Sequence, residues 1–280
     1  MNLPSTNWKA FRRHRAFTLV ELLVAIVILA VLAALTVSAF SAAFDTAKQT
    51  REVSAAKQLI TAYHAYAADN GGRLMPGSST ETIEFSDGTA IGGSFAKRYP
   101  FRIKETLQGN YAGSVVTNER LDKYNEGGSF AEYYLSVWPT FGLNTTFVGG
   151  NHDKFFSEPQ VGIDEATYGA FAVTRMNQAV APNKLIVFAS ATSIDRGELT
   201  YGNFYIHAPN SASVTWERVY DESKNPRTFG HVHPRYNERA VVAHLDGSVD
   251  VLDFEQLLDM TRWSNQAARA GDPDWTLTAK

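Results

Sequence analysis

A long apolar run near the N-terminus is the strongest pattern in the chain. No charged residue occurs between Leu22 and Phe44, so the run exceeds the ~20 apolar residues that a helix needs to cross a bilayer core. The flank before it is basic and contains no acid, with cations at Lys9, Arg12, Arg13 and Arg15. By the positive-inside rule this flank stays in the cytoplasm. The pattern therefore predicts a membrane-spanning helix at 17–44 and an extracytoplasmic C-terminal part.

The helical pattern continues past the apolar run but becomes amphipathic. Apolar residues now recur at spacings of three and four: Val53, Ala56, Leu59, Ile60, Tyr63 and Ala67. Gly71 and Gly72 offer a left-handed C-cap, and no proline occurs between Pro4 and Pro76. We expect one unbroken helix of roughly 50 residues, whose segment 45–70 packs on the domain that follows.

Residues 71–280 predict one globular domain, an antiparallel sheet with long loops and a final helix, on which the long N-terminal helix packs, so the fold class is α+β. Asp87-Gly88 predicts a hairpin within 82–91, and an apolar run predicts a central strand at 185–189. Further strands are expected at 204–206 and on both sides of Asp246-Gly247. Asp253, with Gln256 three residues later, predicts the start of a helix over 254–270.

Glu21 is the one acid at the start of the apolar helix. A carboxylate deep in a bilayer costs on the order of 2.5–3.5 kcal/mol, so such a residue usually faces a partner. A cation supplied by another chain would neutralise it. Two simpler interpretations remain: a secretory signal cut near Ala39 or Ala43, and a plain signal anchor in which Glu21 has no role.

The segment Ala16-Phe17-Thr18-Leu19-Val20-Glu21-Leu22-Leu23 behind a basic leader resembles the N-terminus of type IV pilins and type II secretion pseudopilins. The resemblance implies that 1–16 is a leader, which a prepilin peptidase removes between Ala16 and Phe17 before methylating the new amine. It also implies that Glu21 is an assembly contact. The family usually has glycine before the cut, so Ala16 is a departure that should slow processing.

A second stretch, from Pro234 to Val249, resembles the C-terminal signature of prepilin-like proteins, in which a histidine is followed after nine residues by Asp-Gly. Asp246 and Gly247 match the signature. Tyr236 occupies the position of the histidine. The predicted hairpin is compatible with this exchange, but the role of the family histidine is in doubt here.

Composition narrows the remaining possibilities. The 280-residue chain has a net charge of −3, so no basic field indicates nucleic-acid binding. It contains no cysteine, which excludes disulfides, thiol catalysis and cysteine-ligated zinc. Asp69, Asp87 and Asp246 stand beside glycine or asparagine in predicted turns, where bonding to their own backbone is expected. The resemblance makes calcium possible as a cofactor, but no spacing identifies a site.

Metal ligation is the main catalytic alternative. His231-Val232-His233 would place two imidazoles on one face of a strand, with His244 nearby as a third candidate ligand. No zinc-protease, P-loop or serine-hydrolase motif supports an enzyme. The tryptophans Trp138, Trp216 and Trp263 are expected to be buried anchors, the alternative being a carbohydrate-stacking surface.

The combined prediction is a non-enzymatic subunit of a type II secretion pseudopilus or type IV pilus-like filament. Its expected partners are the prepilin peptidase, other pilin or pseudopilin subunits and the inner membrane, with no nucleic acid. The expected location is single-pass in the inner membrane with a periplasmic domain, then in the filament. The alternative is an extracytoplasmic enzyme or ligand-binding domain that uses the helix only as an anchor.

Overall fold

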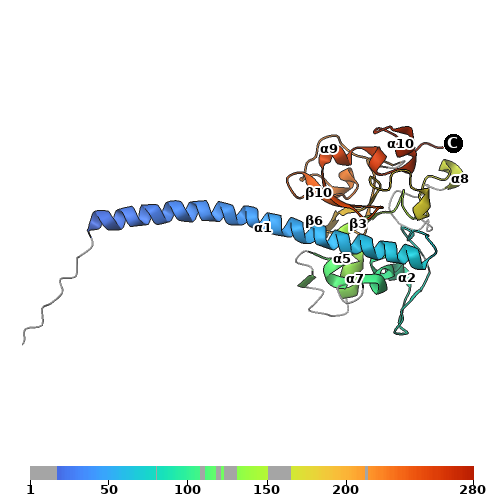
Figure 1. Cartoon of the computed structure of the whole chain (residues 1–280), viewed down its shortest axis with the longest axis horizontal. Helices are drawn as coiled ribbons and strands as arrows, with labels where there is room; N and C mark the ends of the chain where they lie inside the picture. Colours follow the sequence, from blue (N-terminus) through green and yellow to red (C-terminus); the bar gives the residue numbers. More distant parts are fainter. Residues whose placement is uncertain are drawn as a thin grey trace, which may run out of the picture. The chain divides into compact units, whose positions relative to one another are not determined.

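The computed structural model describes residues 18–79, 81–107, 111–117, 121–122, 131–150, 165–211 and 214–280 (Figure 1). The predicted leader 1–16 and Phe17 lie outside this part, as do the side chains of residues 35–42. The chain divides into two compact units, Met1–Ala47 and Lys48–Lys280. The predicted boundary between the apolar and amphipathic parts of the helix, at 44/45, falls close to this division.

Helix α1 (Leu19–Asp69) is continuous over 51 residues, as the sequence predicts. It ends where two glycines follow: Gly71 and Gly72 have φ of +63° and +81°, and the amide of Gly72 donates to the carbonyl of Ala67 at 2.7 Å. In the first unit the large apolar side chains of α1 from Leu19 to Leu32 are exposed. Among the described residues, no helix combines the length and the apolar character needed to cross a membrane.

The second unit is built on a mixed five-stranded sheet. Its strands are β3 (Phe141–Asn144), β4 (Ile186–Ser190), β7 (Tyr205–Ile206), β10 (Arg239–His244) and β11 (Val249–Asp253), in the order β11-β10-β4-β3-β7. All neighbours are antiparallel except β3 and β7, which are parallel. The apolar run predicted as a central strand is β4, which lies in the middle of the sheet. The fold class is therefore α+β, as expected.

Both faces of the sheet are covered. Along β10, Val241 and Ala243 belong to one hydrophobic cluster, and Ala240 and Val242 belong to another. The first cluster contains the buried stripe of α1 and the short helices before β3, whereas the second contains the C-terminal helices. Figure 1 shows α5 (Tyr111–Val115) and α7 (Ala131–Val137) on one side of the strands and α9 (Phe254–Leu257) and α10 (Asn265–Ala270) on the other. This alternation makes the C-terminal half of α1 one layer of the core.

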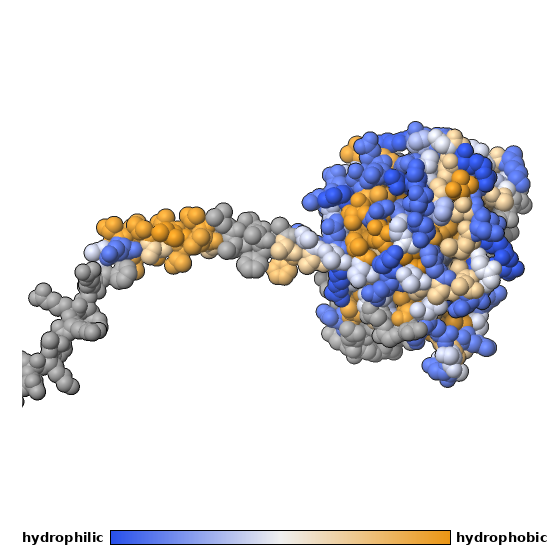
Figure 2. Space-filling view, viewed as in Figure 1, coloured by the Kyte–Doolittle hydropathy of each residue, from blue (hydrophilic) through white to orange (hydrophobic). Residues whose placement is uncertain are grey.

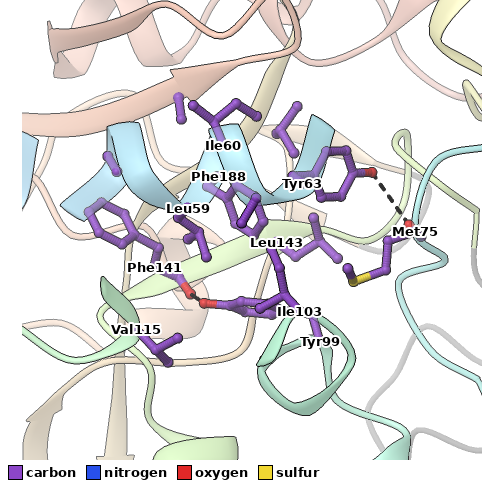
Figure 3. Packing of buried hydrophobic residues seen from close by; sticks show 14 of the residues in the cluster. Leu59, Ile60, Tyr63, Met75, Tyr99, Ile103, Val115, Phe141, Leu143 and Phe188 are labelled. Carbon is purple, nitrogen blue, oxygen red and sulfur yellow. Dashed lines mark hydrogen bonds between the residues drawn. The ribbon is translucent and has the colours of Figure 1, made fainter. Parts of the chain in front are cut away.

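Large side chains fill the first cluster. In Figure 3, Leu59, Ile60 and Tyr63 of α1 meet Phe188 of β4, and the hydroxyl of Tyr99 donates to the carbonyl of Phe141 at 2.7 Å. The rings of Tyr63 and Phe188 meet edge to face at 5.5 Å. The tryptophans predicted as buried anchors are buried: Trp138 is 8%, Trp216 4% and Trp263 0% exposed. The alternative of a carbohydrate-stacking surface for these residues is therefore wrong.

Short elements complete the described part of the unit. Three two-stranded hairpins are β1 (Ile83–Glu84) with β2 (Ala90–Ile91), β5 (Thr192–Asp195) with β6 (Glu198–Tyr201), and β8 (Asn210–Ser211) with β9 (Val214–Thr215). The first confirms the hairpin predicted at Asp87-Gly88. The short helices are α2 (Gly93–Ala96), α3 (Tyr99–Arg102), α4 (Lys104–Leu107), α5 (Tyr111–Val115), α7 (Ala131–Val137), α8 (Glu165–Tyr168), and the 3-10 helices η2 (Met176–Gln178) and η3 (Pro226–Phe229).

The prediction of a single final helix over 254–270 is wrong. It is divided into α9 (Phe254–Leu257), a 3-10 turn η4 (Met260–Arg262) and α10 (Asn265–Ala270). The side chains of Asp259 and Ser264 accept hydrogen bonds from backbone amides two or three residues later, so each starts a new element. The predicted cap is confirmed, since Asp253 and Gln256 form a capping box at the start of α9.

Candidate functional site

Glu21 closes the first turn of α1 on Thr18. Its carboxyl oxygen Oε2 accepts from the amide and from the hydroxyl of Thr18, both at 2.9 Å, and the amide of Glu21 donates to the Thr18 hydroxyl oxygen at 3.2 Å. This is a capping box, in which two otherwise unpaired groups at the helix start satisfy each other. The carboxyl group of Glu21 therefore has a local structural role in addition to any role between chains.

The predicted cleavage pair, Ala16 and Phe17, lies outside the described residues. Glu21 lies within them, on the first turn of α1 and five positions into the chain that would start at Phe17. This first turn begins a stretch of α1 whose large apolar side chains, from Leu19 to Leu32, are exposed.

The signature residue Tyr236 contacts α1. Its hydroxyl donates a short hydrogen bond to the carboxyl group of Glu52, which is only 1% exposed. The hydroxyl of Ser190 on β4 donates to the same carboxyl group at 2.9 Å, and a guanidinium nitrogen of Arg235 lies 3.7 Å from it. Buried carboxyl groups are costly unless they are hydrogen-bonded, so these three partners make the burial of Glu52 possible.

The other end of the signature also contacts α1. The ammonium group of Lys57 donates to the carbonyl of Gly247 at 2.7 Å, and the imidazole Nε2 of His64 lies 2.8 Å from the carbonyl oxygen of Leu245. Gly247 has φ of +90°, and a Cβ at this position would lie 3.1 Å from the His64 ring. Glycine is therefore required by the turn and favoured by the close helix.

The Tyr236–Gly247 stretch thus forms two attachments to α1, one at each end of β10. We call these three contacts the helix clamp: Glu52 with Tyr236, Lys57 with Gly247, and His64 with Leu245. The resemblance identified Tyr236, Asp246 and Gly247 but not the residues of α1 that receive them. The sequence did contain a signal for Glu52. This acid stands one turn before Ala55 and Ala56 on the buried stripe of the helix, where a charged residue requires a partner.

Asp246 and Asp87 occupy turns, as expected. One carboxyl oxygen of Asp246 accepts from the amide of Ser248 at 2.8 Å and from its hydroxyl at 2.6 Å. Asp87 makes the same pair of bonds to Thr89, at 2.8 and 2.6 Å. The hydrogen bonds to Thr89 lower the pKa of Asp87 against a smaller effect of desolvation. At Asp246 desolvation raises the pKa, but the hydrogen bonds to Ser248 contribute to a pKa that is lowered overall. Both residues stabilise their turns.

The three candidate histidine ligands lie in separate environments. His231 has φ of +63° and is not in a strand, so the predicted shared strand face with His233 is wrong. Its Nδ1 lies 2.9 Å from the carbonyl oxygen of Thr192, whereas His233 stacks on Tyr201 at 5.2 Å. His244 lies between the carbonyl of Lys184 and the carboxyl of Asp250, at 2.9 and 3.1 Å. In the described part of the chain, no three His, Asp or Glu residues are placed to hold a metal ion.

Burial keeps these imidazoles neutral. Desolvation lowers the pKa of His231 to about 4 and that of His233 to about 3. His207, whose ring lies 6.5 Å from that of His231, has its pKa lowered to about 3 by desolvation and by the neighbouring His231. Desolvation also lowers the pKa of His244, against the opposing effect of Asp250. These histidines act as buried, uncharged packing groups at neutral pH.

An open groove of about 780 Å³ lies beside η4 and α9. Several carboxyl groups line it, and most already have partners. Asp253 and Asp259 cap α9 and η4, and Asp274 pairs with Arg218 at 2.6 Å. These carboxyl groups stabilise local structure in a groove that Tyr220 and Phe254 also line.

Comparison with known proteins gives one finding. Residues 11–37 match the family described as the prokaryotic N-terminal methylation motif. The match agrees with the resemblance to type IV pilin-like proteins and pseudopilins, and supports a pilin-like prepilin; it does not extend to the C-terminal signature. Neither the search of curated proteins nor the search of solved structures found a match.

Proposed function

We propose that this chain, which carries a prokaryotic N-terminal methylation motif, is a non-enzymatic structural subunit of a type II secretion pseudopilus or type IV pilus-like filament. The observation that carries the proposal is the motif at 11–37, at the start of a 51-residue helix. The large apolar side chains of this helix from Leu19 to Leu32 and at Phe44 are exposed on the single chain (Figure 2), so they need other helices or lipid around them. Filament assembly supplies the helices, and the inner membrane supplies the lipid before assembly.

Processing is the first step of the proposed function. A prepilin peptidase removes 1–16 on the cytoplasmic side and methylates the amine of Phe17, while the C-terminal domain stays in the periplasm. In membranes that contain such a peptidase, mass spectrometry of the purified chain should find a methylated N-terminus at Phe17. A chain that retains its leader, or one that begins near Ala39 to Phe44, would contradict this proposal.

Assembly is the second step, and we assign Glu21 to it. Cleavage creates an amine at Phe17, four residues before the carboxyl group of Glu21. The amine of one subunit and the carboxyl group of the next neutralise each other in an apolar environment, where either charge alone is costly. A head-to-tail contact of this kind repeats without closing and produces a filament.

The capping box allows the role of Glu21 between chains to be separated from its local role. Glu21→Gln removes the charge but keeps an oxygen that accepts from Thr18, so we expect normal processing and loss of filaments. Thr18→Ala is the matched control, because it removes the hydroxyl partner and retains the carboxylate. Recovery in sheared filaments is the measurement. Normal filaments with Glu21→Gln, or equal defects in both variants, would contradict the pairing.

A further inference from the structure

His233 is a buried histidine whose two ring nitrogens make no hydrogen bond to another described residue. Its side chain is 1% exposed. His231 and His244 differ from it, because each of them places a ring nitrogen 2.9 Å from a backbone carbonyl oxygen. A buried polar atom without a partner is costly and rare in folded proteins. The imidazole of His233 therefore has a binding capacity that the contacts of the single chain do not use.

The ring of His233 is held in place and is neutral. It stacks on the ring of Tyr201 at 5.2 Å and an interplanar angle of 18°, and the backbone amide of His233 donates to the carbonyl of Ser190 at 2.8 Å. Desolvation, with a further effect of Arg235, lowers the pKa of His233 to about 3. Only a neutral imidazole binds a metal ion, so this ring is in the ligating state at neutral pH.

A small cavity lies beside this ring. Its volume is about 10 Å³, which is close to the space of one water molecule or one ion. The charged side chains that line it with His233 are Asp221, Glu222 and Lys224. The ammonium group of Lys224 is paired with the carboxyl group of Glu217. The carboxyl groups of Asp221 and Glu222 therefore give the cavity a negative charge, which favours a cation.

The separation of His233 and Glu222 fits two ligands of one metal ion. The imidazole Nε2 of His233 lies 3.5 Å from the carboxyl oxygen Oε1 of Glu222, which is longer than the about 2.7–3.2 Å of an ordinary hydrogen bond from nitrogen to oxygen. Two donor atoms that each lie about 2.0–2.1 Å from a tetrahedral zinc ion are roughly 3.3–3.4 Å apart. The side chain of Glu222 is 63% exposed, so it can move by the small remaining difference without disturbing the core.

We propose that the imidazole of His233 and the carboxyl group of Glu222 together bind a divalent transition-metal ion, of which zinc is the representative. Imidazole and carboxylate are both zinc ligands, whereas calcium and magnesium take oxygen ligands. In the part of the chain that the structure describes, no group of three His, Asp or Glu side chains is placed to hold an ion. Water therefore fills the other positions, and the ion connects the segment 220–224 to His233. The site does not depend on the proposed filament function.

Calorimetric titration of the full chain in detergent with zinc chloride tests the proposal. Zinc should bind, and Glu222→Gln and His233→Gln should each weaken its affinity by at least about tenfold, since loss of a group that only supports a ligand already costs that factor. Glu198→Gln is the matched control, because Glu198 is also an exposed acid but does not line the cavity. Calcium chloride should not bind at the same site. No zinc binding, equal zinc affinity of Glu222→Gln and the unmodified chain, or an equal loss in Glu198→Gln would overturn the proposal.

Limited proteolysis locates the bound ion. Lys224 is an exposed lysine of the segment that carries Glu222, and a lysine-specific protease cleaves after it. At a zinc concentration ten times the dissociation constant, cleavage after Lys224 should be about tenfold slower, because only the metal-free fraction is open to the protease. Glu222→Gln should be cleaved at one rate with and without zinc, and because this residue is exposed, the test holds even if His233→Gln does not fold. An unchanged cleavage rate after Lys224 in the zinc-bound chain would place the ion elsewhere and overturn the proposal.

Discussion

At Tyr236 a phenol hydroxyl reaches the carboxyl group of Glu52 on a helix 184 residues away in sequence. A tyrosine hydroxyl can donate to a carboxyl group as a histidine N–H can. This hydrogen bond gives Tyr236 a physical role, attachment of α1 to the domain. The sequence identified the position, whereas its partner became visible only in the fold.

Removing this hydroxyl is our first prediction at the residue scale. Tyr236→Phe should lower the free energy of unfolding of residues 48–280 by about 1–3 kcal/mol, because the buried carboxyl group of Glu52 loses a donor. Denaturant unfolding measures the change. Tyr134→Phe is the control, since this half-buried ring stacks on Trp138 and its hydroxyl makes no hydrogen bond to another described residue. An equal loss in both variants would contradict a specific bond to Glu52.

Buried histidines make stability depend on pH. The pKa values of His207, His231 and His233 are lowered to about 3, 4 and 3, whereas the unfolded chain binds protons near pH 6.5. The unfolded state therefore binds more protons below this pH. We predict that stability is full above about pH 6.5 and falls as pH decreases toward 4, by up to about 1.4 kcal/mol per pH unit for each histidine.

Unfolding midpoints between pH 7 and pH 4.5 measure this dependence. His207→Gln should reduce its slope, because one proton fewer is taken up on unfolding. A slope unchanged by this substitution would show that His207 does not contribute.

At the scale of elements, the sequence predicted best where local chemistry decides the structure. The length of α1 followed from its periodicity, its glycine cap and the lack of proline. Asp87-Gly88 and Asp246-Gly247 correctly predicted the turns of two hairpins, β1–β2 and β10–β11. The final helix failed because side-chain caps at Asp259 and Ser264 outcompete helix continuation, and Trp263 is fully buried between them. The pattern of apolar residues alone does not reveal such competition.

The cap of α10 provides a prediction at this scale. The Ser264 hydroxyl oxygen accepts from the amides of Gln266 and Ala267 at 3.2 and 3.4 Å and is fully buried. Ser264→Ala should lower the free energy of unfolding by about 0.5–2 kcal/mol. Ser54→Ala, on the exposed face of α1, should have no such effect, because alanine favours a helix interior. Thermal unfolding compares the two variants, and equal melting temperatures would contradict the capping role.

At the scale of the whole molecule, α1 from Lys48 onward belongs to the same compact unit as the sheet. Periodicity predicted which face of 45–70 packs on the domain, but the clamp joins residues more than 180 positions apart. Such pairs are determined by topology, which local patterns do not encode. At the N-terminal end, the family match at 11–37 agrees with the motif identified in the sequence. At the C-terminal end, the sequence identified Tyr236 and Gly247 but not the residues of α1 that contact them.

A truncation follows from this arrangement. Ala56, Leu59, Ile60 and Tyr63 are fully buried in the first hydrophobic cluster. A fragment of residues 48–280 should fold with a cooperative unfolding transition and near-ultraviolet circular dichroism from its tryptophans. A fragment of residues 70–280 should lose that signal and aggregate, because its sheet face is exposed. Cooperative unfolding of the shorter fragment would contradict the assignment of α1 to the core.

The helix clamp also relates two lengths: the distance along α1 from Glu52 to His64 and the length of chain from Tyr236 to Leu245. Glu52 and His64 are twelve positions apart on α1, which is about 18 Å at 1.5 Å per residue. Tyr236 lies across a tight turn from Arg239, its amide donating to the Arg239 carbonyl at 3.0 Å, so the extended part of the path runs from Arg239 to Leu245. A strand rises about 3.3 Å per residue, and these six steps cover nearly the same length. One inserted residue would both overshoot the helix and turn the alternating side chains of β10 to opposite faces. The number of residues between Tyr236 and Leu245 is therefore matched to the length of α1 that separates Glu52 from His64.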